Sequence, residues 1–440
     1  MPAQSKDFKN LSADPQIAAA LKQISPERIQ SNIQKLVSFH TRSTISAQDD
    51  EAIASGKGVG AAREWIKSEF ERYSKDCSGC LEVKTDSFTQ DPADRIPKPT
   101  VITNVYAVLK GTDPESTKRI VLVTGHYDSR NTDTFNVTDA APGANDDGSG
   151  TAVSLECARV LSKLKFPATI IFLTVAGEEQ GLNGSHHFAE MAKAAGWNIE
   201  AALNNDIVGG DRNPEQNTSV VRVFSQGVPE TATEKQLELM KDLGGEDDSP
   251  SRQLARYVAE TARAYSTEVK PLLVFRLDRY LRGGDHLSFL EQGFTAVRFT
   301  EYRENFNHQH QNVRTENGIE YGDLPKFVNF PYVANVARLN AATLASLAAA
   351  PAPPKNVHLL AGSLGYDSTL TWEATATQAP VHYEVLWRLT TSPEWEHNKD
   401  VGNETKVTLP LSKDNVIFAV RALDEQGHGS LPVVPVPARQ

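Results

Sequence analysis

The chain has 440 residues, of which 39% are hydrophobic and 23% are charged, and its formal net charge is -11. This length predicts two or three domains, and the composition is ordinary for a globular protein with a sizeable core. The acidic balance argues against binding to nucleic acid, and no run approaches the roughly 18 apolar residues of a membrane span.

The chain up to residue 350 alternates between helical and strand patterns. Apolar residues at helical spacing predict helices over 25–39, 58–75, 149–164, 251–266 and 332–350. Alternating or continuous apolar runs predict strands over 81–90, 100–111, 119–129, 169–176, 201–206, 220–227 and 293–302. We therefore expect residues 1–350 to form an α/β domain with a mixed, mostly parallel sheet flanked by helices.

The pattern changes after the proline-rich linker APAPPK at residues 350–355. Short alternating segments such as STLTWEA and VHYEVLWRL follow, separated by turn residues. They predict an all-β sandwich over residues 356–440. The strand around Trp372, YEVLWR and FAVRALDEQGHGSLP resemble a fibronectin type III domain. Two roles remain open for this segment: binding of a surface, polymer or partner, and simple stabilisation.

The three cysteines help to predict the cellular compartment in which the protein works. Cys77 and Cys80 form a CSGC motif, whereas Cys157 lies in a helical pattern and is expected to be a small buried residue. Because no second CxxC could complete a four-cysteine metal site, we favour a local disulfide, with two free thiols as the alternative. A disulfide implies an oxidising compartment, so we expect a secreted or periplasmic protein, although MPAQSKDFKN shows no signal peptide.

Polar residues that can bind a metal follow several of the predicted strands. His126 follows IVLVTG, and Asp206 follows AALNN. Glu178 and Glu179 follow IIFLTVAG, and Asp146 lies in the Gly-rich loop GANDDGSG. Because functional groups gather at the carboxyl ends of parallel strands, we expect these side chains to lie together. Histidine and carboxylates without cysteine suit zinc, manganese or a similar ion.

The segments HYDS, GANDDGSG, GEEQGLNGS and NDIVG, in this order and spacing, resemble peptidase family M28 over roughly residues 25–345. The aminopeptidases of that family bind two zinc ions that share one aspartate. The resemblance implies that Asp146 bridges the two ions and that His126 and Asp206 bind one of them. It also implies that Glu179 and a histidine later in the chain bind the other.

The resemblance assigns further roles around these ligands. Glu178 would be the general base, since adjacent acids point in different directions and one of them is free to face the water. Asp128 would orient His126, as metal-bound histidines usually need such a partner. The family also has a cis peptide bond after the bridging aspartate, which here joins Asp146 and Asp147.

The late histidine lies in the segment ENFNHQHQNVR. The family has a Tyr-His pair followed four residues later by Asp. His308 fits this pattern best, because Asn312 then occupies the position of the Asp, and His310 is the alternative. Asn307 replaces the expected Tyr, so the group that would hold the oxyanion stays open, with Tyr302 as one candidate.

Other histidines and acids have less defined roles. GGDHLSF resembles the family's Ser-Asp-His segment, with Gly284 in place of Ser. Asp285 and His286 are therefore expected either on the substrate side of the site or in a structural role. His186 and His187 are expected to cover the start of a helix.

Together these residues imply a metallo-exopeptidase that hydrolyses the N-terminal peptide bond of peptide substrates with two zinc ions as cofactors. Glu178 would take the proton of the attacking water and pass it to the leaving amine. A carboxypeptidase or a glutaminyl cyclase of the same fold is the alternative within the family. A non-catalytic binding protein is the third hypothesis, and the complete set of ligands argues against it.

Overall fold

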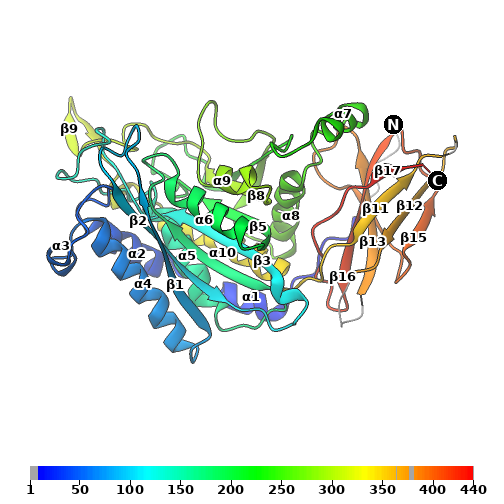
Figure 1. The fold of residues 1–440 in the computed structure, drawn as a ribbon, viewed down its shortest axis with the longest axis horizontal. Helices are drawn as coiled ribbons and strands as arrows, with labels where there is room; N and C mark the ends of the chain where they lie inside the picture. Colours follow the sequence, from blue (N-terminus) through cyan, green and yellow to red (C-terminus); the bar gives the residue numbers. More distant parts are fainter. Residues whose placement is uncertain (1–7, 363, 376–380, 440) are drawn as a thin grey trace.

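The computed structural model describes residues 8–362, 364–375 and 381–439. Its central element is an eight-stranded sheet in the order β1-β2-β4-β3-β5-β8-β6-β7 (Figure 1). These strands are β1 (Leu81–Gln90), β2 (Thr100–Leu109), β3 (Arg119–His126), β4 (Thr169–Val175), β5 (Asn198–Asn205), β6 (Val220–Ser225), β7 (Lys270–Val274) and β8 (Ala296–Glu301). The central strands β4, β3, β5 and β8 are parallel, and β2 and β6 join them antiparallel on either side. The mixed sheet predicted from the sequence is confirmed.

Helices cover both faces of this sheet. They are α1 (Pro15–Leu21), α2 (Pro26–Val37), α3 (Asp50–Ala54), α4 (Gly58–Asp76), α5 (Gly148–Leu161), α6 (Asn183–Ala194), α7 (Glu234–Leu243), α8 (Pro250–Ala264), α9 (His286–Glu291) and α10 (Phe330–Ala349). Val121 and Val123 of β3 belong to the buried cluster that also includes residues of α2, α4, α5 and α10, whereas Leu122 belongs to the cluster on the other face with Phe188 of α6 and Phe289 of α9. Burial on both faces explains the continuous apolar run of β3.

Smaller elements complete this part of the chain. Two 3-10 helices, η1 (Ser116–Lys118) and η2 (Pro325–Phe327), lie in its loops, and β9 (Arg314–Glu316) pairs with β10 (Ile319–Tyr321) in a separate hairpin. Cys77 and Cys80, just after α4, form the disulfide that the sequence predicts, and Cys157 is buried. Among the helices of the described residues, none has the length and apolar character needed to cross a membrane.

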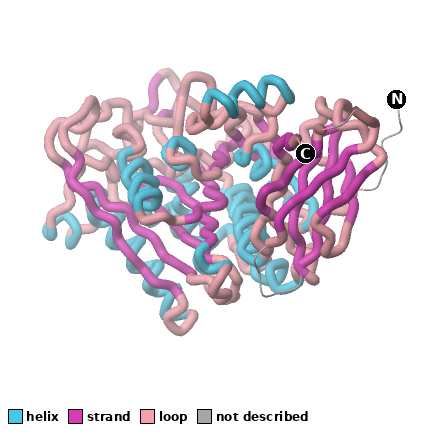
Figure 2. Tube along the Cα trace, turned by 45° about the vertical axis from the view of Figure 1, so that its right-hand side comes forward, coloured by secondary structure: helices cyan, strands magenta, loops and turns pink. Residues whose placement is uncertain are grey.

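The C-terminal residues form two further sheets, which Figure 2 shows as a separate group of strands beside the helical part. One sheet contains β15 (Lys406–Leu409), β12 (Ser368–Glu373), β11 (Lys355–Leu360) and β17 (Val436–Ala438), and the other contains β14 (His397–Asp400), β13 (Val381–Leu389) and β16 (Val416–Asp424). Their buried cluster includes Trp372, Tyr383 and Phe418. This β-sandwich-like arrangement agrees with the predicted fold class.

Buried charges join these C-terminal sheets to α8. The guanidinium of Arg421 on β16 contacts Glu260 of α8 at 2.8 Å and Glu384 of β13 at 2.6 Å, and all three side chains are at most 8% exposed. The carboxylate of Glu260 also accepts a hydrogen bond from the backbone N–H of Leu11. The two parts of the chain therefore meet through ion pairs that water does not reach.

A histidine continues this interface toward the N-terminal segment. His428 lies 2.7 Å from Asp424 through Nδ1 and 3.3 Å from Asp14 through Nε2. Burial alone would lower the pKa of His428, but Asp424 and Asp14 raise it above the usual value. The pair with Asp14, the N-cap of α1, ties this helix to the C-terminal sheets.

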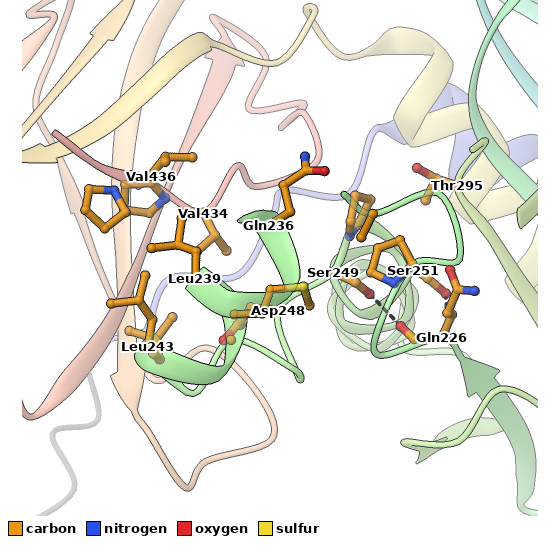
Figure 3. Close-up of a pocket in the computed structure, with 18 of the residues that line it drawn as sticks. Gln226, Gln236, Leu239, Leu243, Asp248, Ser249, Ser251, Thr295, Val434 and Val436 are labelled. Carbon is orange, nitrogen blue, oxygen red and sulfur yellow. Dashed lines mark hydrogen bonds between the residues drawn. The ribbon is translucent and has the colours of Figure 1, made fainter. Parts of the chain in front are cut away.

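A largely apolar pocket of about 450 Å³ lies along the same interface (Figure 3). Leu239 and Leu243 of α7 line it from one side, and Val434 and Val436 from the C-terminal segment line it from the other. Helix α7 thus faces the C-terminal sheets across this pocket, although none of its own residues is buried.

Candidate metal centre

The Asp146 carboxylate stands at the centre of the candidate site. One of its oxygens lies 3.2 Å from Nε2 of His126, and the other lies 2.8 Å from Nε2 of His310. The peptide bond between Asp146 and Asp147 is cis, as the family resemblance implies. Asp146 therefore belongs to two groups of potential ligand atoms at once, one with His126 and Asp206 and one with Glu179 and His310.

The first group lies at the carboxyl ends of β3 and β5. His126 is the last residue of β3 and is fully buried. Its Nδ1 lies 3.4 Å from a carboxylate oxygen of Asp128, which leaves Nε2 directed at Asp146 and, at 3.9 Å, at Asp206. The second oxygen of Asp206 contacts the buried guanidinium of Arg298 at 2.9 Å, so a single oxygen of Asp206 faces the group.

The second group contains Glu179 and His310. Nε2 of His310 lies 3.0 Å from one carboxylate oxygen of Glu179, and the other oxygen accepts a hydrogen bond of 2.9 Å from Arg130. Burial alone would lower the pKa of His310, but Glu179 and Asp146 raise it to about 10. The imidazole is thus held between two carboxylates.

This placement corrects the sequence prediction, which preferred His308. The ring of His308 stacks on Phe327 at 3.6 Å between centroids, and its Nδ1 contacts Asp211 instead of the cluster. His310 has a left-handed backbone, with φ of 56°, which turns its ring back toward Asp146. The spacing argument based on Asn312 failed because this turn changes which histidine faces the site.

The structure also reveals positioning residues that the sequence did not single out. The carboxylate of Asp323 accepts hydrogen bonds from the backbone N–H groups of Asn145 and Asp146, at 2.7 to 2.9 Å. The Asp147 side chain accepts from the N–H groups of His126 and Gly150, so it joins the end of β3 to the start of α5. These contacts fix the backbone of the loop that carries Asp146.

Buried Arg42 serves the same loop from the N-terminal segment. Its guanidinium donates to the carbonyls of Leu36, Tyr127, Pro142 and Gly143. The Arg42 guanidinium thus forms hydrogen bonds with four carbonyls from three segments of the chain. The sequence around Arg42 reads Arg-Ser-Thr and contains no recognisable motif, so no signal in the sequence pointed to this residue.

The remaining acids make the site strongly anionic. Burial, together with the nearby carboxylates of Asp206, Glu179 and Asp285, raises the pKa of Glu178 well above its usual value. Burial also raises the pKa of Asp285 to about 6, with contributions from Asp206 and Asp128. Glu178 and Asp285 therefore lie within electrostatic reach of the same cluster.

Other predicted residues lie farther from the cluster. Nε2 of His286 donates to the carbonyl of Leu277, and burial lowers its pKa to about 4, which indicates a structural role. Tyr302 and Asn307 are exposed. At Gly284 a Cβ atom would lie 2.3 Å from the Arg298 guanidinium, so the absence of a side chain there makes room for the contact between Arg298 and Asp206.

The donor atoms fit divalent cations. Within each of the two groups the potential ligand atoms lie within 4.8 Å of one another. His126 Nε2 and Glu179 Oε1 are buried and form no hydrogen bond of good geometry among the described residues, although each lies near another potential ligand, Asp146 and His310 respectively. Imidazole and carboxylate donors suit zinc and similar ions, and a cation would compensate the surplus of carboxylates.

The fold and this cluster define an α/β protein with a histidine–carboxylate centre at the carboxyl ends of its parallel strands. Comparison with known families identifies it further. The model of peptidase family M28 matches residues 104–326. A probable zinc metalloprotease of Pyrenophora tritici-repentis is 47% identical over 429 residues, which cover 96% of this chain and 87% of that protein. The chain belongs to peptidase family M28.

Solved structures show the same fold at low sequence identity. The LapA aminopeptidase of Legionella pneumophila has 21% identity and a TM-score of 0.53, and the match covers 79% of this chain and 78% of that one. A glutaminyl cyclase of Porphyromonas gingivalis has 18% identity and a TM-score of 0.50, and the match covers 73% of this chain and 97% of that one. Proteins with different activities share this fold, so the assignment of a reaction depends on the site.

Proposed function

We propose that this peptidase is an aminopeptidase that removes N-terminal residues from peptides with two zinc ions. The observation that supports two ions is the Asp146 carboxylate, which faces His126 with one oxygen and His310 with the other. Asp206 would complete the first zinc site and Glu179 the second. The relatives named as probable zinc metalloproteases support zinc as the metal.

The side chains divide the chemistry between them. When bound, the two zinc ions would polarise the scissile carbonyl and lower the pKa of the attacking water. Glu178 accepts the proton of that water and passes it to the leaving amine. Asp128 holds Nδ1 of His126, so that Nε2 stays available as a ligand. Asp285 is fully buried, so its carboxyl group would act on the free amine of the substrate only through its charge and without contact.

The role of Glu178 is tested by Glu178→Gln. We expect at least a hundredfold loss of kcat with zinc content still near two per chain, because general-base catalysis contributes about 10²–10⁴-fold. Glu190→Gln, which changes an exposed acid on α6, is the matched control and should retain activity. Near-normal turnover by Glu178→Gln would show that another group is the base.

The exopeptidase assignment is tested with a panel of substrates. We expect hydrolysis of aminoacyl arylamides and of peptides with a free N-terminus, and no hydrolysis of N-acetylated peptides. Cleavage confined to N-blocked peptides would favour a carboxypeptidase or an endopeptidase. Release of ammonia from peptides with N-terminal glutamine, without hydrolysis, would favour the glutaminyl cyclase reaction.

We also infer that the protein works in an oxidising compartment, because the disulfide between Cys77 and Cys80 would not persist in a reducing one. Secretion is the simplest route to such a compartment. Fractionation of the producing cells tests this inference, and recovery of the protein in the cytosol with both thiols free would refute it.

A further inference from the structure

A second pocket, of about 540 Å³, is lined mainly by cationic and aromatic side chains. Its wall is built from three segments, namely β6, the residues that follow β7, and the loop after β8. Four arginines and a single carboxylate line it: Arg222, Arg276, Arg279, Arg282 and Glu304. We call this set of residues the arginine pocket.

The charges of the arginine pocket are not balanced. The side chain of Glu304 is 6% exposed, and it pairs with Arg222 at 3.0 Å, with Arg279 at 3.0 Å and with Arg282 at 2.6 Å. Arg276 forms no ion pair with any residue that the structure describes, and its guanidinium lies over the Tyr280 ring at 5.4 Å. Glu304 therefore pairs with three arginines, and Arg276 remains available to bind an anion.

Aromatic side chains frame the opening of the pocket. Tyr280 is 76% exposed and Phe306 is 65% exposed, and each lies beneath a guanidinium, Arg276 in the first case and Arg282 in the second. An arginine stacked on an aromatic ring keeps its N–H groups directed outward while its flat face is covered. Two such N–H groups of one guanidinium match the geometry of the two oxygens of a carboxylate.

A continuous chain of ion pairs connects this pocket to the candidate metal centre. Arg279 contacts Asp278 at 3.0 Å, Asp278 contacts Arg298 at 3.3 Å, and Arg298 contacts Asp206 at 2.9 Å. The carbonyl of Gly283 accepts hydrogen bonds from both Arg279 and Arg298. Because three contacts of about 3 Å and the two intervening groups separate them, Arg279 lies within roughly 15 Å of Asp206, a distance that about four extended residues can span.

We propose that the arginine pocket binds a carboxylate of the peptide substrate and gives the enzyme a preference for peptides that carry an acidic group within their first four residues. This inference rests on the proposed aminopeptidase function, which places the substrate N-terminus at Asp206 and its neighbours. The carboxylate is either a Glu or Asp side chain or the C-terminal carboxylate of a short peptide. Arg276 and Arg282 are the specificity-determining residues, since both are exposed.

The test compares peptides that differ only in Glu or Gln at position one, two, three or four, each with a free or an amidated C-terminus. We expect kcat/KM to be about five- to tenfold higher for Glu than for Gln at one of these positions. In the variant Arg276→Gln/Arg282→Gln this ratio should fall to about one. If amidation instead lowers kcat/KM of short peptides to the same extent, and Arg276→Gln/Arg282→Gln removes this effect, the ligand is the C-terminal carboxylate.

Arg303→Gln is the matched control, because Arg303 is an exposed arginine one residue after Tyr302 that pairs with Glu215 outside the pocket. It should keep the Glu to Gln ratio of the wild type. An equal loss in Arg303→Gln would show a general effect of surface charge and overturn the proposal. Equal rates for Glu and Gln peptides in the wild type, together with equal rates for free and amidated C-termini, would also overturn it.

A binding measurement separates this proposal from the proposed function. Fluorescence anisotropy with peptides whose first amide is replaced by a non-hydrolysable methyleneamine reports affinity without turnover. Tighter binding of the Glu peptide, lost in Arg276→Gln/Arg282→Gln, supports the pocket even if no peptide is hydrolysed. Hydrolysis of neutral peptides, combined with equal affinity for Glu and Gln peptides and for free and amidated C-termini, would refute the pocket and leave the aminopeptidase function intact.

Discussion

Replacing Arg421 with Met removes the cation between two buried carboxylates. Glu260 of α8 and Glu384 of β13 both lose their cationic partner, and neither side chain is more than 8% exposed. Breaking a buried ion pair by removing one partner costs about 3–5 kcal/mol, because an uncompensated charge stays buried. Because the unfolding entropy of a 440-residue chain is about 0.9 kcal/mol/K, we expect Arg421→Met to lower the melting temperature by about 3–5 °C.

Differential scanning calorimetry measures this loss, and Arg263→Met is the control. Arg263 lies on the same helix and pairs with Glu394 across the same interface, but this pair is about 40% exposed, so its removal should cost less than about 1 kcal/mol. The variant Glu260→Gln/Glu384→Gln/Arg421→Met, which removes all three charges, should recover most of the stability. Equal losses in Arg421→Met and Arg263→Met would refute the argument from burial.

Three further predictions concern the site and the interface. The variant His310→Ala should bind one zinc ion per chain instead of two, whereas His308→Ala should still bind two, as measured by atomic emission. The opposite result would favour His308 as the ligand. Asp323→Asn should weaken zinc binding about 10–100-fold, measured by chelator competition, because the loop of Asp146 loses its carboxylate acceptor; unchanged affinity would contradict this. The pKa of His428 is raised in the folded protein, so its contribution to stability is fully present below pH 6.5 and is lost as the pH rises through the folded-state pKa. The melting temperature of His428→Gln should therefore lie below that of the wild type at pH 6 and approach it at pH 9. A difference that stays constant with pH would contradict this role of His428.

Local sequence patterns predicted the central strands well. The apolar runs of β3 and β4 are buried on both faces, and strand ends in a parallel sheet must place their next residues at a common edge. This is why the sequence could predict that His126, Glu179 and Asp206 gather with Asp146. The short helix α9 was not predicted, because six residues carry too little periodicity to distinguish a helix from a loop.

The contacts that hold the site in place could not be predicted. Asp323 and Asp146 are separated by 177 residues, and the Arg42 guanidinium reaches carbonyls up to 101 residues away. Nothing in the neighbouring sequence distinguishes these side chains from solvated surface charges. The choice between His308 and His310 failed for a related reason, because one left-handed residue decides which ring faces the cluster.

The buried charges also bear on the role of the C-terminal sheets. Arg256 of α8 stacks beside Trp395, and the Tyr257 hydroxyl donates to the carbonyl of Gly429, so α8 contacts these sheets along much of its length. The same helix packs against α10, which in turn packs against β3, the strand that ends at His126. Removing residues 356–440 would therefore leave Glu260 without its cationic partner Arg421 and uncover α8. We expect such a truncated protein to lose stability together with activity, whereas a tethered binding module could be removed without either effect. Retained turnover and an unchanged melting temperature after truncation would refute this stabilising role of the sheets.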